Sequence, residues 1–398
     1  MIAIELFLYL LLAISFLMIG YQVILGISAI YLKPIEQFNA ELYRRFAIVI
    51  PAHNEEKMIA KTIYSLFSLN YPNKLFDVIV VADNCTDQTA EISTGLGATV
   101  WERTDDKKQG KGYALSWGFE KLLKSSADYD AVIVIDSDSL ISGNFLTVMN
   151  DYLEQGIPVI QSNDLVLPQP GNWSIESTRI GFILTNFIKP LGRKNLGLFA
   201  GLRGNGMCFR TDVLRDVPWQ AWSLTEDVEF GLTLILKGYK IEFSPEAVVW
   251  AQMPVHSSNA ESQRSRWERG RSQITKNFAG TFLKKAIRNR SIRFFDVFID
   301  LITPPFVNMM LFVSIMTVIS FLMWIFGWIA PIALWLWILL IFVGVFHLLL
   351  GLKTAKADRM LYKSILYIPI YIAWKLKMYA KSLTAKREMK WIRTTRDI

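Results

Sequence analysis

The stretch AVIVIDSDS, residues 131–139, joins a continuous apolar run to two aspartates, Asp136 and Asp138. An apolar run without alternation is typical of a strand buried on both faces, as in a parallel sheet covered by helices. Such runs lie at 46–50, 77–82, 98–101 and 131–136, and helical patterns separate them at 55–69, 87–95 and 111–124. This alternation predicts an α/β fold with a Rossmann-like, mostly parallel sheet and helices on both faces.

Two long stretches predict membrane-spanning helices. Leu6–Leu32 and Leu301–Leu352 contain no Asp, Glu, Lys or Arg, and one span needs about 20 apolar residues. The first stretch fits one span, and the second fits two with a break at Gly327–Pro331, where Gly and Pro can end helices. We expect a transmembrane helix within 1–33 rather than a cleaved signal peptide, and two more within 301–352.

Basic residues gather beside these stretches. Between Arg264 and Arg293 there are ten Lys or Arg and a single acidic residue, Glu268. The positive-inside rule therefore predicts an N-terminus outside the cell and a cytoplasmic middle region. We expect amphipathic interfacial helices over 261–300 and a basic, interfacial and cytoplasmic tail over 353–398. The net charge of +8 is then membrane-surface charge, and nucleic acid is not an expected partner.

Polar residues follow the predicted strands at the edge where a doubly wound sheet binds ligands. Pro51, Asn54 and Glu55 follow the first strand, Asp83 follows the second, and the DSD run closes the fourth. In isolation a DSD run is a solvated turn, but after a buried strand Asp136 and Asp138 can approach one hard cation, Mg²⁺ or Mn²⁺ rather than zinc. No G-x-G-x-x-G follows the first strand, which weighs against a dinucleotide cofactor.

Two further motifs each have a structural and a functional interpretation. Thr225-Glu226-Asp227 precedes a helical pattern at 226–238, where Thr225 can cap the helix, or a carboxylate can act as general base. In AESQRSRWERGR, residues 260–271, Gln263 and Arg266 share a helix face beside Trp267. These residues either anchor the helix at the membrane or bind a diphosphate and stack on a sugar.

Basic and small residues elsewhere leave similar alternatives. Lys107, Lys108 and Lys111 in KKQGKGYAL precede a helix and fit either phosphate binding or surface charge. Glycines in GLRGNGMCFR, residues 201–210, permit close approach to a ligand or a simple turn. The three histidines, His53, His256 and His347, show no ligand or triad spacing, and we expect each to be structural.

Seven motifs, taken in chain order, resemble those of the membrane-embedded family 2 glycosyltransferases of GT-A fold, which include cellulose, hyaluronan and poly-N-acetylglucosamine synthases and ceramide glucosyltransferase. The motifs are PAHNEE (51–56), VADNCTD (81–87), GKGYAL (110–115), DSD (136–138), GNGMCFR (204–210), TED (225–227) and QRSRW (263–267). The resemblance covers roughly 46–270 and implies a cytoplasmic GT-A domain over 44–260.

The resemblance implies a role for each matching residue. Pro51, Asn54, Glu55, Asp83 and Lys111 would bind the donor nucleotide, and Asp136 and Asp138 the metal and diphosphate, with Asp138 favoured as direct ligand. Asp227 would be the general base, with Glu226 beside it in the catalytic motif. Gln263 and Arg266 would close over the diphosphate, and Trp267, Gly204 and Asn205 would contact the acceptor.

The expected activity is transfer of a hexose from a UDP-sugar to a hydroxyl of a membrane lipid or a growing polysaccharide. One general base without a second catalytic carboxylate suits a single displacement with inversion. Three spans are few for a translocation channel, which slightly favours a lipid acceptor over a processive synthase. A catalytically silent scaffold and a sugar-nucleotide hydrolase are the alternatives. No residue pattern bears on the oligomeric state.

Overall fold

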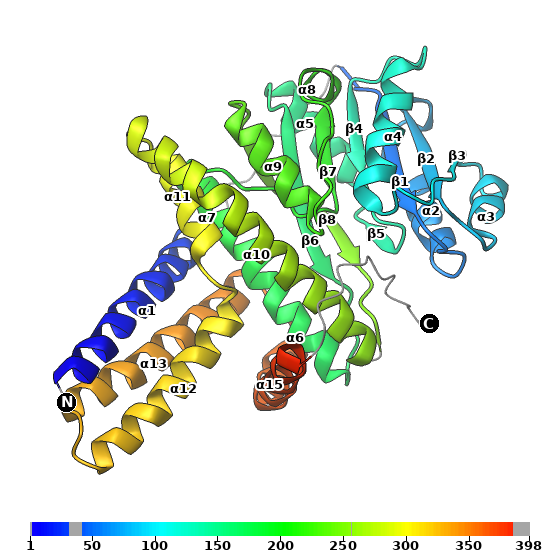
Figure 1. The fold of residues 1–398 in the computed structure, drawn as a ribbon. Coiled ribbons are helices and arrows are strands. Elements are labelled where there is room, and N and C mark those ends of the chain that lie inside the picture. Colours follow the sequence, from blue (N-terminus) through cyan, green and yellow to red (C-terminus); the bar gives the residue numbers. More distant parts are fainter. Residues whose placement is uncertain (1, 32–41, 256, 385–398) are drawn as a thin grey trace.

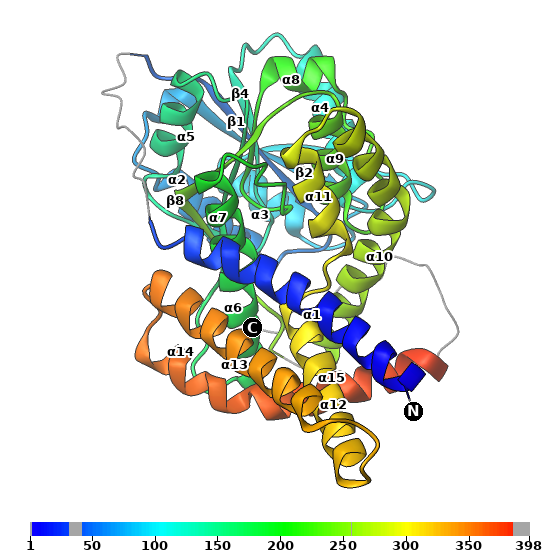
Figure 2. The same cartoon turned by 90° about the vertical axis from the view of Figure 1, so that its left-hand side faces the viewer.

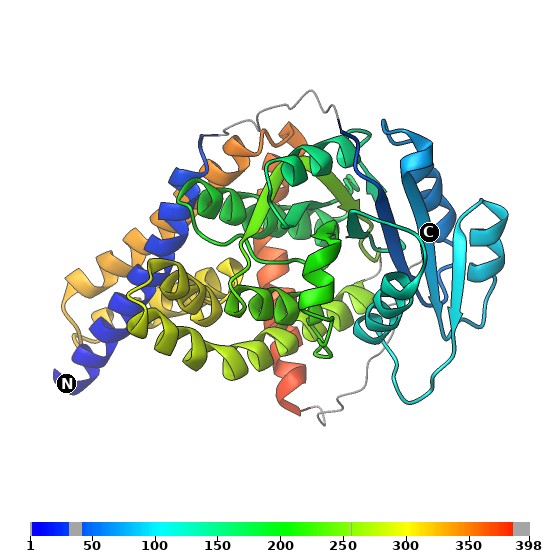
Figure 3. The ribbon, with the colours of Figure 1, turned by 90° about the horizontal axis from the view of Figure 1, so that it is seen from above.

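The computed structural model describes residues 2–31, 42–255 and 257–384 and places an eight-stranded sheet at its centre (Figures 1 and 3). The strand order is β3-β2-β1-β4-β7-β6-β8-β5. The strands are β1 (Phe46–Ala52), β2 (Phe76–Asp83), β3 (Thr99–Arg103), β4 (Ala131–Val134), β5 (Ser139–Ile141), β6 (Val159–Val166), β7 (Met207–Arg210) and β8 (Ile241–Ala251).

The first four strands in spatial order are parallel, as the apolar runs predict. Ile48 of β1 lies opposite Val78 of β2 on one side and Ile133 of β4 on the other. The remaining part of the sheet is mixed, because β7 runs antiparallel to both β4 and β6, and β5 runs antiparallel to β8. Only β6 and β8 form a further parallel pair. The sheet is thus parallel from β3 to β4 and mixed beyond β4.

Alternating side chains of the strands fill two cores, one on each face of the sheet. Val49 and Val81 pack with Phe119 of α4 and Phe230 of α9 on one face, and Ile48 packs with helices α2 and α5 on the other. The helices of this region are α2 (Ile59–Phe67), α3 (Thr89–Gly95), α4 (Lys111–Lys124), α5 (Phe145–Glu154), α6 (Trp173–Phe182), α7 (Lys189–Asn195), α8 (Thr211–Asp216) and α9 (Glu226–Leu236), with short helical segments η1 (Asn73–Leu75) and η2 (Ile183–Ile188).

Three helices of the described chain are long and apolar enough to cross a membrane: α1 (Ile2–Ser28), α12 (Phe306–Ile325) and α13 (Pro331–Thr354). They pack together and project away from the sheet (Figures 1 and 2). The break between α12 and α13 falls at the predicted Gly-Pro turn. His347 is buried where α13 meets α1, and a side chain at Gly26 would collide with its ring.

Two long helices connect the sheet to this bundle. The predicted amphipathic region forms α10 (Ser257–Arg288) and α11 (Ile292–Ile302), and the segment after α13 forms α14 (Arg359–Lys363), η3 (Ser364–Tyr367) and α15 (Ile368–Thr384). In Figure 1, α15 lies beside α6. Among the residues placed by the structure, α15 is not one of the helices that qualify as spans. His256 and the tail from 385 lie outside the described residues.

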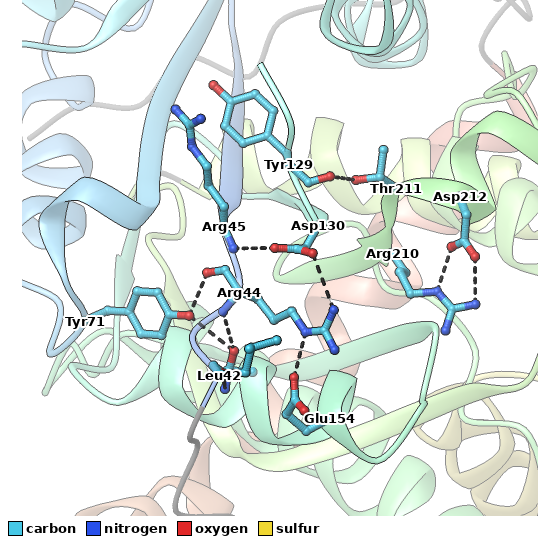
Figure 4. Close-up of polar contacts among 11 residues, drawn as sticks. Leu42, Arg44, Arg45, Tyr71, Tyr129, Asp130, Glu154, Arg210, Thr211 and Asp212 are labelled. Carbon is cyan, nitrogen blue, oxygen red and sulfur yellow. Dashed lines mark hydrogen bonds and ion pairs between the residues drawn. The ribbon is translucent and has the colours of Figure 1, made fainter. Parts of the chain in front are cut away.

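A polar network closes the amino end of the sheet, opposite the edge where ligands are expected (Figure 4). Arg44 Nε donates to Glu154 Oε1 at 2.7 Å, and the Arg45 amide donates to Asp130 Oδ2 at 2.7 Å. The Thr211 hydroxyl donates to the Tyr129 carbonyl at 2.6 Å and ties α8 to the start of β4. The side chains of Arg44, Asp130 and Glu154 are about one-quarter to two-fifths exposed, and Thr211 is buried. The network ties the strand ends to the neighbouring helices.

Candidate active site

A single cavity of about 1220 Å³ connects the carboxyl ends of the strands with the membrane helices. At the sheet its walls carry Asp164 and the polar or charged motif residues Lys111, Asp136, Asp138, Glu226, Asp227, Gln263 and Arg266. At the other end they are mainly apolar and come from α12, α13 and α15: Phe306, Val307, Met310, Ile341, Val345, Leu348, Ile368 and Ile372. The cavity therefore adjoins both a polar pocket and the predicted membrane region.

Lys111 joins two of the sequence motifs at the polar end. It is the first residue of α4, and the preceding Gly110 has a φ of 114°, which a residue with a side chain rarely adopts. Its Nζ donates to Asp136 Oδ1 at 2.5 Å and to the Gly204 carbonyl at 2.6 Å. The carboxyls of Asp136, Glu226 and Asp227 together raise the pKa of Lys111, so the ammonium is the positive centre of the pocket.

The buried side chains of Asn186, Asn205 and Asp164 lie next to the two DSD aspartates. Asn205 accepts from the Asp136 amide at 3.1 Å through Oδ1, and its Nδ2 lies 3.4 Å from Asp164 Oδ1. Asn186 donates to the other Asp164 oxygen at 3.2 Å. Burial and the charges of Asp136 and Asp138 raise the pKa of Asp164 well above its usual range. Asn205 is buried and also lines the cavity, as do Asp164 and Asn186, which no sequence motif singled out.

Glu226 and Asp227 begin α9 side by side. A side chain at Gly204, which has a φ of 87°, would meet Asp227 Oδ2 at 2.9 Å, so the glycine lets the backbone approach this carboxylate. Burial raises the pKa of Glu226 to about 7 and also raises that of Asp227, while Lys111 opposes both shifts. Thr225 occupies the expected N-cap position of α9, but its side chain makes no capping hydrogen bond.

The AESQRSRWERGR segment lies within α10, with Gln263 and Arg264 buried. Arg266 lines the cavity, and its Nε is buried with no hydrogen-bond partner among the described residues. Trp267 packs on Phe182 at 5.9 Å between ring centroids, and it also lines the cavity.

The other arginines of this helix are not simply headgroup anchors. The Arg264 guanidinium lies 4.8 Å from the Trp374 ring and donates to Thr178. Arg271 Nη2 donates to the carbonyls of Asp300 and Thr303 at 2.7 and 2.6 Å. Both side chains therefore fasten α10 to neighbouring helices, whereas Arg269 is exposed.

A sequence model of the family described as glycosyltransferase like family 2 matches residues 44–270, more than half of the chain. The chain belongs to glycosyltransferase family 2. The probable glycosyltransferase YdaM of Bacillus subtilis is 26% identical over 387 residues, which cover 90% of this chain and 88% of that protein. This match therefore extends beyond residues 44–270 and reaches the region of α12 and α13.

Two other similar proteins are informative mainly about the fold. The poly-beta-1,6-N-acetyl-D-glucosamine synthase of Staphylococcus epidermidis is 26% identical over 239 residues, 57% of this chain, and the match spans about half of that synthase (55%). The mannosyltransferase PcManGT of Pyrobaculum calidifontis, solved with GDP-Man and Mn²⁺, has a TM-score of 0.55 at 14% identity and covers 93% of this chain and 97% of its own. At this identity the structural likeness shows that the glycosyltransferase has a GT-A fold.

Four of the residues expected at the donor nucleotide do not line the cavity of this glycosyltransferase: Pro51, Asn54, Glu55 and Asp83. Asp83 is buried in an ion pair with Arg103, with 2.5 Å between Oδ1 and Nη1, and His53 Nδ1 lies 2.7 Å from the Asp83 carbonyl. Burial raises the pKa of Asp83 even though Arg103 lowers it. His53 therefore has a structural contact, and Arg103 is the missed partner, recognisable only as a basic residue ending the third strand.

By themselves, the two DSD aspartates supply too few ligands to complete the coordination of a cation. Within the described ranges no group of three or more His, Cys, Asp or Glu side chains could hold a metal ion. Asp136 and Asp138 nevertheless line the same cavity wall, and oxygen ligands suit Mg²⁺ or Mn²⁺, which usually combine one or two carboxylates with substrate phosphates. The residues fit such an ion if the donor diphosphate supplies further ligands.

Several further cavity residues of the glycosyltransferase were given no role by the family resemblance. Trp222 is 45% exposed and stacks on Tyr113, with ring centroids 4.5 Å apart, so two aromatic faces border the opening near α4. Lys107 lines the cavity as well. Arg203 lines it beside the 204–210 motif and has buried Nε and Nη2 atoms without partners in the described part of the chain. In the sequence Trp222 and Arg203 resemble ordinary surface residues, whereas Lys107 was already a candidate for phosphate binding.

Proposed function

We propose that this glycosyltransferase moves a hexose from a UDP-sugar to a hydroxyl of a membrane lipid, with inversion at the anomeric carbon and with a divalent metal. The observation that carries the proposal is the cavity, which runs without interruption from Asp136 and Asp227 to apolar side chains of α12 and α13. A donor sugar held at the polar end and a lipid entering from the bilayer would meet at Asp227.

The apolar end of the cavity favours a lipid over a polysaccharide as acceptor. Phe306, Met310, Val345 and Leu348 belong to the beginning of α12 and the second half of α13, and they offer no hydrogen bonds to a hydrated sugar chain. An acyl chain can contact such a wall without leaving an apolar environment, whereas a sugar chain there would lose hydrogen bonds to water. A processive synthase is the second candidate, favoured by the similarity to poly-N-acetylglucosamine synthases.

Asp227 would act as the general base. It would accept the proton of the acceptor hydroxyl as that oxygen attacks the anomeric carbon and the bond from this carbon to the diphosphate breaks. Lys111 and Arg266 would stabilise the negative charge on the departing UDP, since charged donors fixed in a buried pocket interact strongly with developing charge. A Mg²⁺ or Mn²⁺ held by Asp138 and Asp136 would neutralise the diphosphate in the same way. Gln263 and Trp267 would enclose the sugar from α10.

We also propose that the catalytic domain faces the cytoplasm, with the N-terminus outside. Three membrane crossings by the candidate spans would put the N-terminus and the sheet on opposite sides of a bilayer, and the basic residues of α10 and α11 favour the cytoplasmic surface for the sheet. A cysteine-accessibility experiment tests this orientation. A cysteine placed in the turn between α12 and α13 should be labelled from outside intact cells, and one replacing exposed Arg288 should not.

The activity is tested by incubating the purified full-length protein with Mn²⁺ and a panel of radiolabelled UDP-sugars, with and without membrane lipid. The products are separated by size and by partition into organic solvent. A single glycolipid product would support the proposal, whereas a polymeric product would show that the protein is a processive synthase. Release of free sugar without any acceptor product would identify a hydrolase, and no turnover with any donor would indicate a silent scaffold.

A further inference from the structure

We infer that the lipid acceptor carries an anionic headgroup and that Arg203 and Arg271 bind that headgroup next to Asp227. The inference rests on the proposed function and specifies the class of lipid. It is carried by a buried cluster of charges between α7, α10 and α11, at the junction of the polar and apolar parts of the cavity.

The cluster contains more positive than negative side chains. Its carboxylates, Asp296 and Asp300 of α11, are both engaged by α7. Arg193 lies 3.2 Å from Asp296 Oδ2 and 3.1 Å from Asp300 Oδ2, and Lys189 pairs with the other oxygen of Asp300. Arg203 and Arg271 are close enough that both help to hold the pKa of Asp300 well below its usual range. Neither forms an ion pair with any residue described in the structure, so no carboxylate of the cluster contacts either guanidinium directly.

Arg203 has unused hydrogen-bonding capacity. Its Nε and Nη2 atoms are buried without partners in the described ranges, and burial together with the repulsion of Arg193 and Arg271 lowers its pKa. A guanidinium removed from water without acceptors is unfavourable. Its planar fork matches two oxygens of a phosphate or carboxylate, which would satisfy both donors at once.

The position of the two arginines distinguishes a lipid headgroup from other anions. Arg203 precedes Gly204, the residue packed against Asp227, and its charge lowers the pKa of Asp227. Arg271 bonds the carbonyls at the end of α11 and the following loop, which leads directly into Phe306 of the apolar wall. A phosphate at these arginines therefore adjoins the base on one side and the acyl groove on the other. The donor diphosphate has its own cations, Lys111 and Arg266.

A matched pair of lipids tests the inference. The full-length protein is reconstituted in phosphatidylcholine nanodiscs that contain either dioleoylphosphatidylglycerol or dioleoylglycerol, which both present a hydroxyl but differ in the anionic phosphate. Native mass spectrometry then measures which lipid the extracted protein retains. We expect the wild type to prefer phosphatidylglycerol by about tenfold or more, the difference of one charge-assisted pair. We expect Arg203→Gln to abolish the preference and Arg203→Lys to restore part of it.

The control is Arg288→Gln, which removes an exposed arginine from the same basic region and should leave the preference unchanged. Equal retention of the two lipids by the wild type, or an unaltered preference in Arg203→Gln, would overturn the inference. So would a loss of UDP affinity in Arg203→Gln, because it would assign Arg203 to the donor. Efficient transfer to dioleoylglycerol without any preference would reject the headgroup site alone, whereas a polymeric product would reject the proposed function itself.

Discussion

Lys111 Nζ donates a hydrogen bond to Asp136 Oδ1 over 2.5 Å and so joins the start of α4 to the end of β4. The two side chains are about one-quarter and one-third exposed, and both face the cavity. The pair neutralises one of the two DSD carboxylates before any ligand binds. A donor diphosphate would then encounter an ammonium already positioned by Asp136 and by the Gly204 carbonyl.

Lys111→Gln is expected to weaken donor binding. The substitution removes a charge-assisted contact to the diphosphate and leaves Asp136 without its cation, so UDP affinity should fall roughly tenfold or more. Isothermal titration with UDP and Mn²⁺ measures the effect. Lys124→Gln at the other end of α4 removes an exposed lysine, 74% accessible, and serves as control. Equal UDP affinity of the two variants would remove Lys111 from the donor site.

Asp227→Asn is expected to abolish transfer and to leave UDP binding nearly unchanged. The amide keeps the shape of the side chain but cannot accept the acceptor proton, which should lower kcat by about 10²–10⁴-fold. Turnover and UDP titration on the same preparation separate the two effects. Asp212→Asn, which alters an exposed aspartate paired with Arg210, should behave as wild type. If Asp227→Asn loses UDP binding instead, the residue is a donor ligand and not the base.

Arg266→Ala is expected to lower kcat by about 10²–10³-fold, because a fixed donor to the leaving diphosphate acts mainly in the transition state. Membrane association should be unaffected, as measured by flotation with vesicles. Arg269→Ala removes an exposed arginine of the same helix and should retain activity. The reverse pattern, with activity kept and flotation lost, would make Arg266 a membrane anchor.

The pH at which kcat/KM falls on the acid side, the acid limb of the profile, should lie above the usual pKa of a carboxyl group. Burial raises the pKa of Asp227 in the folded protein, and activity requires the deprotonated base, so transfer is lost as the pH falls through that raised pKa. Lys111 opposes this shift. Its replacement by glutamine should therefore move the limb to still higher pH. A pH profile of residual activity in Lys111→Gln checks the direction, and a limb displaced to lower pH would contradict the role of Asp227.

Arg193→Met is expected to destabilise the fold by about 3–5 kcal/mol, since it leaves buried carboxylates without their partner. The side chains of Arg193 and Asp296 are only 3% and 4% exposed, and Arg193 also donates to Tyr21 of α1 at 2.7 Å. Denaturation in detergent measures the free energy of unfolding. Arg210→Met breaks an exposed ion pair and should cost no more than about 1 kcal/mol. Similar losses in both variants would show that the buried network contributes no special stability.

Local patterns in the sequence determined the strands and helices of the parallel half of the sheet and the three apolar helices. They succeeded because a continuous apolar run or an uncharged stretch of 20 residues has few alternative structures. They also identified Lys111, Asp136, Glu226 and Asp227, which the fold brings to one cavity. Local patterns did not predict the antiparallel strand β7, because the direction of a strand depends on partners that are distant in the chain.

The roles of individual charged side chains were decided by tertiary structure alone. Asp83 sits behind the cavity because Arg103 pairs with it, and Arg271 is turned inward by the carbonyls of Asp300 and Thr303. Arg203 is a candidate ligand because its Nε and Nη2 donors are buried without partners among the described residues, near Asp227. Only the tertiary structure brings these groups together. The sequence thus specified which chemical groups the protein has and where its chain can cross a bilayer. Burial and distant partners, which set the free energy of a charge, decided which of those groups face the substrate.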